Sequence, residues 1–409
     1  MPLPEDTCGD FTVCALLRPI LVFSTNDAWV FGHRIKSEKP TIYEGLALRW
    51  NGQTWSRESV AGRSFQAATA TSPADLWLGD AERLVPGKYP FECNANGPAQ
   101  RWDGDMWHKT ADPSGACMEV VGLKAFAPDD VWSIAADHTS MVGPYGASFI
   151  ARSDGREWTV VPHPPGVGLM LAIDGVAAND VWIVGTTPAP TTDVRLDPIA
   201  LHWDGTEWTR FSIPGVEDRS VFLSSVRTFS STDVWAVGSS GTDRPFVARW
   251  NGKDWARVVV PAGGALRDIA LGGDQLVAVG YSSPPPFAPF VLRYDGNGFV
   301  KVPGPTTSGM LEGITSTDGS GRFWVSGTGD SGEAMIAEYV PPSGAGGYTS
   351  PGAREDVPGT TREPEKKASD GCGCGVLGLP RPSPAPFGIV AGAILVRCGV
   401  RRLRSRPRR

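Results

Sequence analysis

The sequence contains few of the residues, and none of the motifs, that usually mark an active site. Only five of its 409 residues are histidine, and they are dispersed along the chain. No His-Glu-x-x-His segment occurs, and no His or Cys residues have the spacing of a zinc site. Nucleophile-elbow, phosphate-loop and dinucleotide-binding motifs are missing as well. We therefore expect no catalytic residue, no bound metal and no cofactor.

Positive charge is scarce outside the last few residues. Seven of the 38 basic residues lie between Arg397 and Arg409, so residues 1–396 hold 31 basic against 44 acidic side chains, a net charge of −13. A protein that binds the phosphate backbone needs a basic surface, so we expect no nucleic-acid partner for this body. The terminal arginines could form a nucleic-acid arm, but the apolar run directly before them favours a membrane-related role.

A phrase of the type Asp-Val-Trp-x-Val-Gly recurs through the first 330 residues. Clear copies are NDAWVFG at 26–32, NDVWIVG at 179–185 and TDVWAVG at 232–238. Successive copies lie 48, 55, 50, 53, 42 and 47 residues apart, and a period near fifty residues indicates one supersecondary unit per repeat. Val277 holds the tryptophan position of the sixth copy. The other six copies place there Trp29, Trp77, Trp132, Trp182, Trp235 and Trp324, which we expect to form the core.

A second phrase alternates with the first, as in LRWNGQTW at 48–55 and LHWDGTEW at 201–208. Asn-Gly or Asp-Gly between apolar runs predicts a tight β-hairpin, with either two or four residues in its loop. In both cases Trp50 and Trp55 point to one face of the sheet, which we expect to pack on the next repeat. The Asp of the first phrase suits a turn, because its carboxylate can accept hydrogen bonds from nearby backbone N–H groups.

Each repeat therefore reads as four short strands, and seven repeats predict an all-β protein: a seven-bladed β-propeller of four-stranded antiparallel blades over residues 8–340. The seventh repeat runs into PPSGAGG at 341–347 without a fourth strand. Residues 8–17, CGDFTVCALL, resemble the missing strand, with Phe11 in its second aromatic position. We expect this N-terminal strand to complete the last blade and close a monomeric ring. The alternative is that residues 1–17 form a frayed end.

The connections within a repeat differ in length. Turns between the first and second strands, and between the third and fourth, are tight; we call their side the tight-turn face. Connections between the second and third strands are long and variable, as at 33–46, 80–98, 186–198 and 281–289. They share a side, the loop-rich face, with the links between blades. Because variable loops on a rigid scaffold commonly carry binding residues, we expect a protein or glycan ligand there.

The DVWAVG and RWDGxxW phrases resemble the repeats of bacterial propellers of the BNR and kelch-like kind. The resemblance covers residues 8–340 and implies the fold without specifying a function. The Asp-box of sialidases separates Asp from Gly by one residue, whereas the two are adjacent in this sequence. The Gly-Gly doublet of kelch repeats is absent.

Two functions remain compatible with these repeats. The first is a non-catalytic cell-surface module that binds or scaffolds through the loop-rich face, which is the interpretation we favour. The second is a sialidase-like or other glycan-processing enzyme, which would need carboxylates and arginines converging at the mouth of a central channel. Candidates near the first strands are Glu119, Arg227, Arg267, Asp268 and Glu312, although they are scattered along the sequence.

Two pairs of cysteines flank predicted strands. Cys93 and Cys117 lie nearly opposite each other at the base of the second-repeat hairpin, which suits the geometry of a disulfide. A bridge there would indicate an oxidising compartment, and two separate thiols are the alternative. Cys8 and Cys14 would be about 20 Å apart if the strand between them forms, too far to pair.

The last seventy residues differ from the repeats in composition. Residues 341–370 hold Pro, Gly, Ser, Thr and charge without apolar periodicity, which predicts a disordered linker. Residues 371–409 combine a Cys motif, a short apolar run at 387–396 and the arginine cluster. This order resembles the MYXO-CTERM sorting tail of myxobacterial surface proteins, with Cys372 and Cys374 matching its Cys motif. The resemblance implies export, then lipoprotein-like anchoring or release at the surface.

The apolar run is short for a permanent membrane span. Ten residues make about 15 Å of helix against a bilayer core of ~30 Å, so a transient sorting segment fits better. Arg401 and Arg402 would then stay cytoplasmic. Residues 1–23 lack a basic n-region and are interrupted by Arg18-Pro19, so we expect a signal peptide to be encoded upstream of Met1. The expected destination is the outer membrane, the cell surface or the medium.

Overall fold

The computed structural model of the chain describes most of residues 3–350. All seven cysteines, Arg401 and Arg402 lie outside the described residues, as does everything beyond Ser350. No helix in the described part is long and apolar enough to cross a membrane. The described residues are 3, 15–38, 41–80, 99–110, 118–137, 147–188, 196–215, 220–241, 244–316, 320–330, 332–342, 347–348 and 350.

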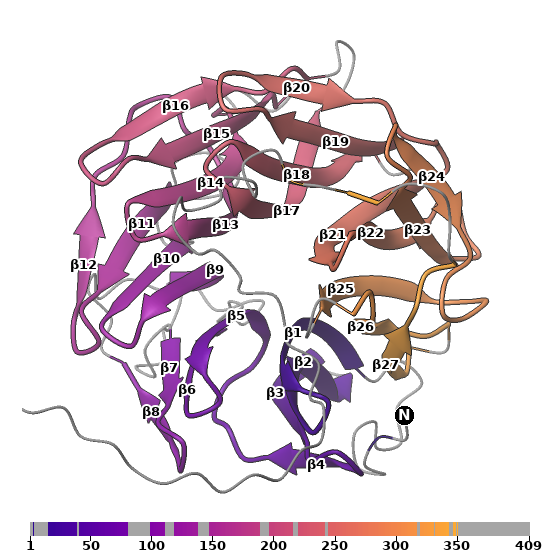
Figure 1. Cartoon of the computed structure of the whole chain (residues 1–409). Helices are drawn as coiled ribbons and strands as arrows, with labels where there is room; N and C mark the ends of the chain where they lie inside the picture. Colours follow the sequence, from indigo (N-terminus) through magenta and orange to yellow (C-terminus); the bar gives the residue numbers. More distant parts are fainter. Residues whose placement is uncertain are drawn as a thin grey trace, which may run out of the picture. The chain divides into compact units, whose positions relative to one another are not determined.

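The described strands form seven antiparallel sheets around one axis, so the chain is an all-β, seven-bladed propeller (Figure 1). Each blade is a meander whose consecutive strands are hydrogen-bonded, as the repeats predicted. Blades 1 to 6 have four strands, and blade 7 has three within the described residues. The strands are β1 (Ala15–Ser24), β2 (Asp27–Glu38), β3 (Thr41–Trp50) and β4 (Trp55–Glu58) in blade 1; β5 (Phe65–Ser72), β6 (Asp75–Asp80), β7 (Ala99–Trp102) and β8 (Trp107–Lys109) in blade 2; β9 (Met118–Ala127), β10 (Asp130–Asp137), β11 (Ala147–Ser153) and β12 (Trp158–Val161) in blade 3; β13 (Met170–Ala177), β14 (Asp180–Thr186), β15 (Pro198–Trp203) and β16 (Trp208–Ser212) in blade 4; β17 (Val221–Ser230), β18 (Asp233–Ser240), β19 (Arg244–Trp250) and β20 (Trp255–Val258) in blade 5; β21 (Gly264–Gly272), β22 (Gln275–Ser282), β23 (Pro289–Tyr294) and β24 (Phe299–Val302) in blade 6; and β25 (Met310–Ser316), β26 (Phe323–Thr328) and β27 (Ala334–Tyr339) in blade 7.

Burial is greatest in the second strand of a blade and lower in both the innermost first strand and the outermost fourth strand. Every residue of β14, the second strand of blade 4, is buried. In the fourth strand, β16, Trp208 is buried and the other residues are exposed or half-buried. The second strands lie between neighbouring blades on both faces, which is why the sequence shows them as nearly continuous apolar runs.

The tryptophan of a second strand packs against the hairpin of the following blade. The ring centroid of Trp182 in blade 4 lies 5.0 Å from that of Trp250 and 5.5 Å from that of Trp255 in blade 5. Trp324 of blade 7 lies 6.2 and 6.1 Å from Trp50 and Trp55 of blade 1, so the same contact closes the ring. Six second-strand tryptophans are at most 4% exposed, namely Trp29, Trp77, Trp132, Trp182, Trp235 and Trp324.

Hydrogen bonds also join the first and last blades. The Ser326 hydroxyl donates to the Arg18 carbonyl oxygen at 2.9 Å, and the Thr328 hydroxyl donates to that of Ala15 at 3.2 Å. Leu3 packs against the apolar core that these two blades share. The sequence predicts the closing strand over residues 8–17, but residues 15–17 belong to β1, where they pair with β2 of blade 1. Residues 8–14 lie outside the described residues, so their pairing with the last blade stays a prediction.

The hairpins between third and fourth strands use the four-residue alternative. Trp50 pairs directly with Trp55, and Asn51 Oδ1 accepts hydrogen bonds from the backbone N–H groups of Gln53 and Thr54 at 2.9 and 2.8 Å. Gly52 takes a φ of +92°, which few other residues adopt. Where Asp replaces Asn, the same hydrogen bonds stabilise the ionised carboxylate relative to the protonated acid and so lower the pKa of the side chain. At Asp204 the side-chain and backbone bonds from Thr206, with the Glu207 N–H, lower the pKa to about 2.

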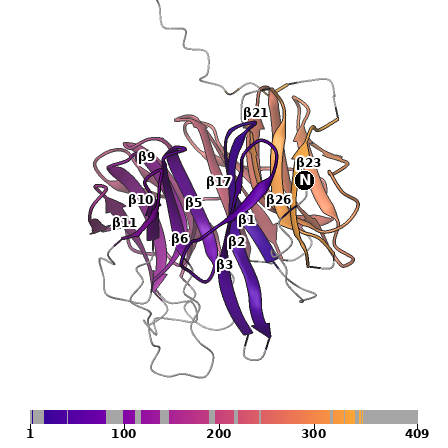
Figure 2. The ribbon, with the colours of Figure 1, turned by 90° about the horizontal axis from the view of Figure 1, so that it is seen from below.

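The connection at 33–46 is a continued hairpin rather than a loop. β2 and β3 stay paired as far as Glu38 and Thr41, and the hairpin extends well past the neighbouring strands on the loop-rich face (Figure 2). Arg34 and Glu44 lie directly opposite each other, with Arg34 Nε 2.7 Å from Glu44 Oε2. This cross-strand ion pair supports pairing that the charged, Pro-containing sequence did not suggest.

Each first strand carries a β-bulge, where at least one residue has no partner on the second strand. In blade 5 the register passes from Leu223↔Gly238 to Ser225↔Val237, which leaves Ser224 unpaired. The strands approach so closely here that a Cβ on Gly238 would lie 2.0 Å from the Phe222 carbonyl oxygen. The same close approach, at distances of 1.9 to 2.1 Å, leaves no room for a side chain at Gly32, Gly185, Gly280 and Gly327. In blades 2 and 3 the bulge takes Asp80 and Ala135 at this position instead.

Gly238→Ala should lower the free energy of unfolding by roughly 1–3 kcal/mol, because the new methyl group cannot fit against backbone. Gly298→Ala is the matched control, since its Cβ would meet nothing within 4 Å, and it should change stability by no more than about 0.5 kcal/mol. Denaturant unfolding of both variants measures the difference. Equal stabilities would show that the bulge does not require this glycine.

Candidate functional site

The first strands of the seven blades line a channel along the axis of the ring, with a cavity of about 740 Å³. This volume lies within the range of small-ligand pockets. Each bulge occurs near the start of its strand, so the bulged residues lie toward the loop-rich face. They form one level of the channel wall, which we call the bulge ring: Arg18, Gln66, Val121, Leu171, Ser224, Arg267 and Glu312.

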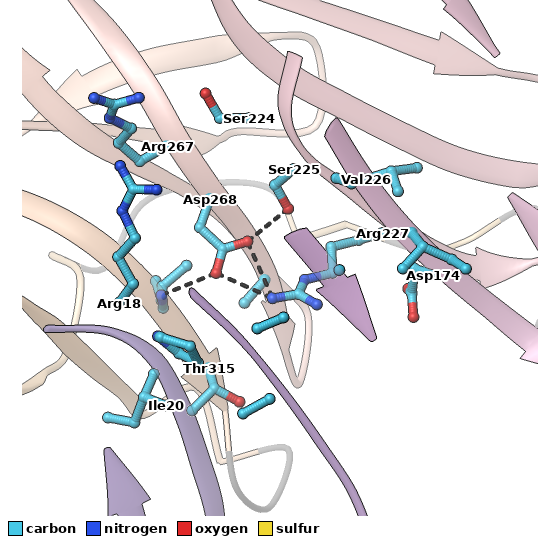
Figure 3. Close-up of a pocket in the computed structure, with 18 of the residues that line it drawn as sticks. Arg18, Ile20, Asp174, Ser224, Ser225, Val226, Arg227, Arg267, Asp268 and Thr315 are labelled. Atoms are coloured by element: carbon cyan, nitrogen blue, oxygen red, sulfur yellow. Dashed lines mark hydrogen bonds and ion pairs between the residues drawn. The ribbon is translucent and has the colours of Figure 1, made fainter. Parts of the chain in front are cut away.

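Asp268 in β21 is engaged by three adjacent blades (Figure 3). Its Oδ1 accepts a hydrogen bond from the Ser225 hydroxyl at 2.7 Å, and Arg227 Nη2 donates to both carboxylate oxygens at 3.1 and 3.0 Å. The backbone N–H groups of Ile269 and Ile314 donate at 2.9 and 3.2 Å. The Asp268 carboxylate raises the pKa of the Arg227 guanidinium above its ordinary value. This carboxylate therefore stabilises the joint between blades 5, 6 and 7.

Asp174 in β13 does the same for blades 3, 4 and 5. Lys124 Nζ lies 2.6 Å from Asp174 Oδ1, and the Thr228 N–H donates to Oδ2 at 2.8 Å. Lys124 comes from β9 and Thr228 from β17, so the carboxylate bridges the blades on either side of its own. The Asp174 carboxylate thus binds one cation from blade 3 and one backbone N–H from blade 5.

Glu312, the bulged residue of β25, lies between arginines from both neighbouring blades. Its Oε2 is 3.2 Å from Arg18 Nε and 3.4 Å from Arg267 Nε. The Glu312 side chain is only 3% exposed, whereas those of Arg18 and Arg267 are 36% and 31% exposed. One buried carboxylate therefore serves two cations whose outer atoms remain open to the channel.

The structure brings together most of the charged residues that the sequence analysis named for an enzyme. Arg227, Arg267, Asp268 and Glu312 all line the channel. Glu119 is not among its lining residues, and its Oε1 accepts a hydrogen bond from Gln66 Nε2 at 2.8 Å. Among the described residues, no three His, Cys, Asp or Glu side chains gather as a metal-binding group.

Sequence reasoning missed Arg18, Lys124 and Asp174, which also line the channel. For Lys124 and Asp174 the sequence does contain a signal. Lys124, Asp174 and Arg227 pair directly with the second-strand tryptophans of blades 3, 4 and 5, so three successive repeats carry a charge at the same position. Arg18 sits on a bulge, and bulges cannot be placed from the repeat alone.

The Asp of the repeated phrase makes an ion pair in addition to starting the strand. In blade 5, Asp233 Oδ1 lies 2.9 Å from Arg249 Nε, and the Arg249 guanidinium stacks 5.0 Å above the Trp235 ring. Blade 7 reverses the charges, with Arg322 Nη1 2.8 Å from Glu338 Oε1. The Asp–Arg–Trp arrangement recurs in blades 1 to 3 as Asp27–Arg49–Trp29, Asp75–Arg101–Trp77 and Asp130–Arg152–Trp132.

In blade 5 this cluster also binds a segment that follows the last blade. The Tyr348 hydroxyl donates to Asp233 and accepts hydrogen bonds from Trp235 Nε1 at 2.9 Å and Arg249 Nη2 at 3.1 Å. The Ser350 hydroxyl donates to Asp233 Oδ2 at 2.6 Å. Burial raises the pKa of Tyr348 above its ordinary value. The composition of 341–370 predicts that Tyr348 and Ser350 belong to a linker, yet both are buried here, so the folded part continues beyond residue 340.

No protein-family model and no curated protein matches the chain. Solved structures match at low identity. A structure described as YCF48 bound to D1 peptide has a TM-score of 0.51 and 13% identity, and covers 83% of this chain and 97% of that chain. A puromycin-hydrolyzing peptidase of Mycobacterium tuberculosis has a TM-score of 0.55 and 11% identity, over 83% of this chain and 54% of that one. This chain thus spans about half the length of the peptidase, and likeness at this identity shows the propeller fold alone.

Tyr348→Phe should lower the free energy of unfolding by roughly 1–3 kcal/mol, because it leaves buried polar groups of Asp233, Trp235 and Arg249 with one partner fewer. Tyr281→Phe is the control, since within the described residues the Tyr281 hydroxyl makes no hydrogen bond, and it should be near neutral. Thermal and denaturant unfolding measure both. If the two variants were equally stable, the segment around Tyr348 would not be fixed to blade 5 as described.

Proposed function

We propose that this chain is a non-catalytic binding module that takes a segment of a partner protein at the loop-rich face, centred on the mouth of the channel. The main observation in support is that the acidic and basic side chains of the channel differ in exposure. Asp174, Asp268 and Glu312 are buried and already contacted by cations, whereas Arg18 and Arg267 expose about a third of their side chains. The polar groups left for a ligand are thus mainly donors.

The same observation disfavours a glycan-processing enzyme. Glycosidases need a pair of carboxyl groups that flank the scissile bond, one to protonate the leaving group and one to act as nucleophile or base. Asp268 accepts hydrogen bonds from a hydroxyl, a guanidinium and two backbone N–H groups, which leaves no such role for it. Glu312 is almost fully buried beneath two arginines. The gathering of Arg227, Arg267, Asp268 and Glu312 in one channel keeps the enzyme as the second candidate.

Other features of the fold support a polypeptide as the ligand. A rigid ring of seven blades presents its longest connections on one face, and such faces commonly bind other proteins. One propeller of similar fold was solved with a peptide bound. A glycan at the same face remains the alternative ligand.

Tyr348 and Ser350, which follow the last described strand, lie on the side of the propeller opposite the proposed binding face. Both contact Asp233, which lies next to the turn between the first and second strands of blade 5, on the tight-turn face. Export and anchoring through Cys372 and Cys374 are part of this proposal.

The test is to select peptides from a phage-displayed random library against the full-length chain and to measure their binding by calorimetry. Ser224→Trp places a large side chain on the bulge ring and should weaken binding at least tenfold. Lys253→Trp adds the same side chain to a tight turn on the opposite face and should leave binding unchanged.

Failure to select any peptide, or peptides that are lost with Lys253→Trp and kept with Ser224→Trp, would overturn the proposal. Hydrolysis of a glycoside by the wild-type chain, lost in Glu312→Gln and kept in Arg322→Gln, would replace it with the enzyme.

A further inference from the structure

We infer that Arg18 and Arg267 form a carboxylate-binding site on the bulge ring, which takes an acidic side chain or the chain terminus of the bound partner. This inference rests on the proposed function and specifies the chemistry of the ligand. Guanidinium groups bind carboxylates through paired N–H donors, so two of them side by side make a directional site for one such group.

The first step is the count of charges along the channel. Lys124 pairs with Asp174 and Arg227 pairs with Asp268, one cation to one carboxylate. Arg18 and Arg267 share Glu312 alone. The described charges lining the channel therefore leave one positive charge in excess, and it is located at this pair.

The second step is the direction of the free donors. The ion pairs with Glu312 involve the Nε atoms, on the inner side of each guanidinium group. In Figure 3 the guanidinium groups of Arg18 and Arg267 lie next to each other, in keeping with their shared contact to Glu312. Their terminal nitrogens are thus the groups that a ligand in the channel would meet.

The third step is that both arginines are held in place. The Arg18 carbonyl accepts a hydrogen bond from Ser326, and a Cβ on Gly313 would lie 2.2 Å from this oxygen, so blades 1 and 7 are in close contact here. The Arg267 guanidinium stacks 5.2 Å from the centre of the Tyr281 ring. A site that is ordered before binding loses less conformational entropy when the ligand arrives.

The surroundings limit the ligand to a single acidic group. Residues 1–396 carry a net charge of −13, which would repel a polyanion such as a nucleic acid. Tyr281, which stacks on Arg267, packs edge-to-face against Phe287 at 5.4 Å. Phe222, which also lines the channel, is 38% exposed. These rings offer apolar contact to the residues next to the carboxylate, so an acidic group beside an aromatic residue is the best match.

The test uses three small probes and the full-length chain. Acetyl-Phe-Ala carries a terminal carboxylate, acetyl-Phe-Asp-amide carries a side-chain carboxylate, and acetyl-Phe-Asn-amide is neutral. Their dissociation constants are measured by NMR titration at low ionic strength. We expect at least one carboxylate probe to bind tenfold or more tightly than the neutral probe. Preference for one of the two identifies the source of the carboxylate.

Charge variants separate a binding role from a structural one. Arg18→Gln and Arg267→Gln should each weaken the carboxylate probe at least tenfold and leave the neutral probe unchanged. Glu312→Gln removes the competing carboxylate and should tighten the carboxylate probe several-fold, whereas residues that only neutralised Glu312 would show no gain. Arg267→Lys keeps the charge and should retain part of the affinity if Arg267→Gln proves unstable. Arg322→Gln, on an exposed pair of blade 7, is the control and should have no effect.

Equal binding of the charged and neutral probes, or no gain with Glu312→Gln, would overturn the inference. If library peptides still bind and Ser224→Trp still blocks them, the proposed function stands without this site. If the carboxylate probes bind but no library peptide does, the site stands and the proposed function fails.

Discussion

The ring depends on one repeated contact, in which a tryptophan from the second strand of a blade enters the aromatic face of the next blade's hairpin. Trp182 does so against Trp250 and Trp255, and Trp324 does so against Trp50 and Trp55 across the closure. Large aromatic side chains dominate the energetics of such interfaces because each buries a large apolar area. The exception is informative: Val277 takes the position in blade 6, and it packs in a cluster with Tyr339 of blade 7, whose described part has no fourth strand.

The bulge on each first strand links this packing to the proposed site. In five blades the first strand approaches the second so closely at the bulge that only the glycine of the repeated phrase fits there. The bulge also places one extra side chain per blade at the channel wall, and those side chains include Arg18, Arg267 and Glu312. The carboxylates deeper in the channel join neighbouring blades through backbone N–H groups and cations. Stability and binding thus depend on different residues of the same strands. The carboxylates mostly stabilise the ring, and the exposed arginines are available to bind a ligand.

Much of the fold could be predicted because the repeated phrases are local and periodic. The count of seven blades, the four-stranded meander and the shared face of Trp50 and Trp55 all follow from spacing and parity. The features that sequence reasoning missed depend on contacts between distant segments. The docking of Tyr348 on Asp233 joins residues 115 positions apart. Tyr348 is the only aromatic residue of 341–370, but the sequence does not indicate which blade it contacts. The hairpin at 33–46 could not be predicted because its charged strands lack an apolar alternation and pair mainly with each other.

Hydrogen exchange on the Trp324→Ala variant tests the contact between blades 7 and 1 that closes the ring, by following the amides of blade 1. Removing this side chain should cost about 3–5 kcal/mol locally. Because Trp324 packs on Trp50 and Trp55, amides of β3 and β4 should exchange faster together with those of β26, although some 270 residues of sequence separate them. Trp77→Ala, at the joint between blades 2 and 3, should leave β3 and β4 protected. A ring closed as described requires that difference; faster exchange confined to blade 7, with β3 and β4 as protected as in the wild type, would contradict it.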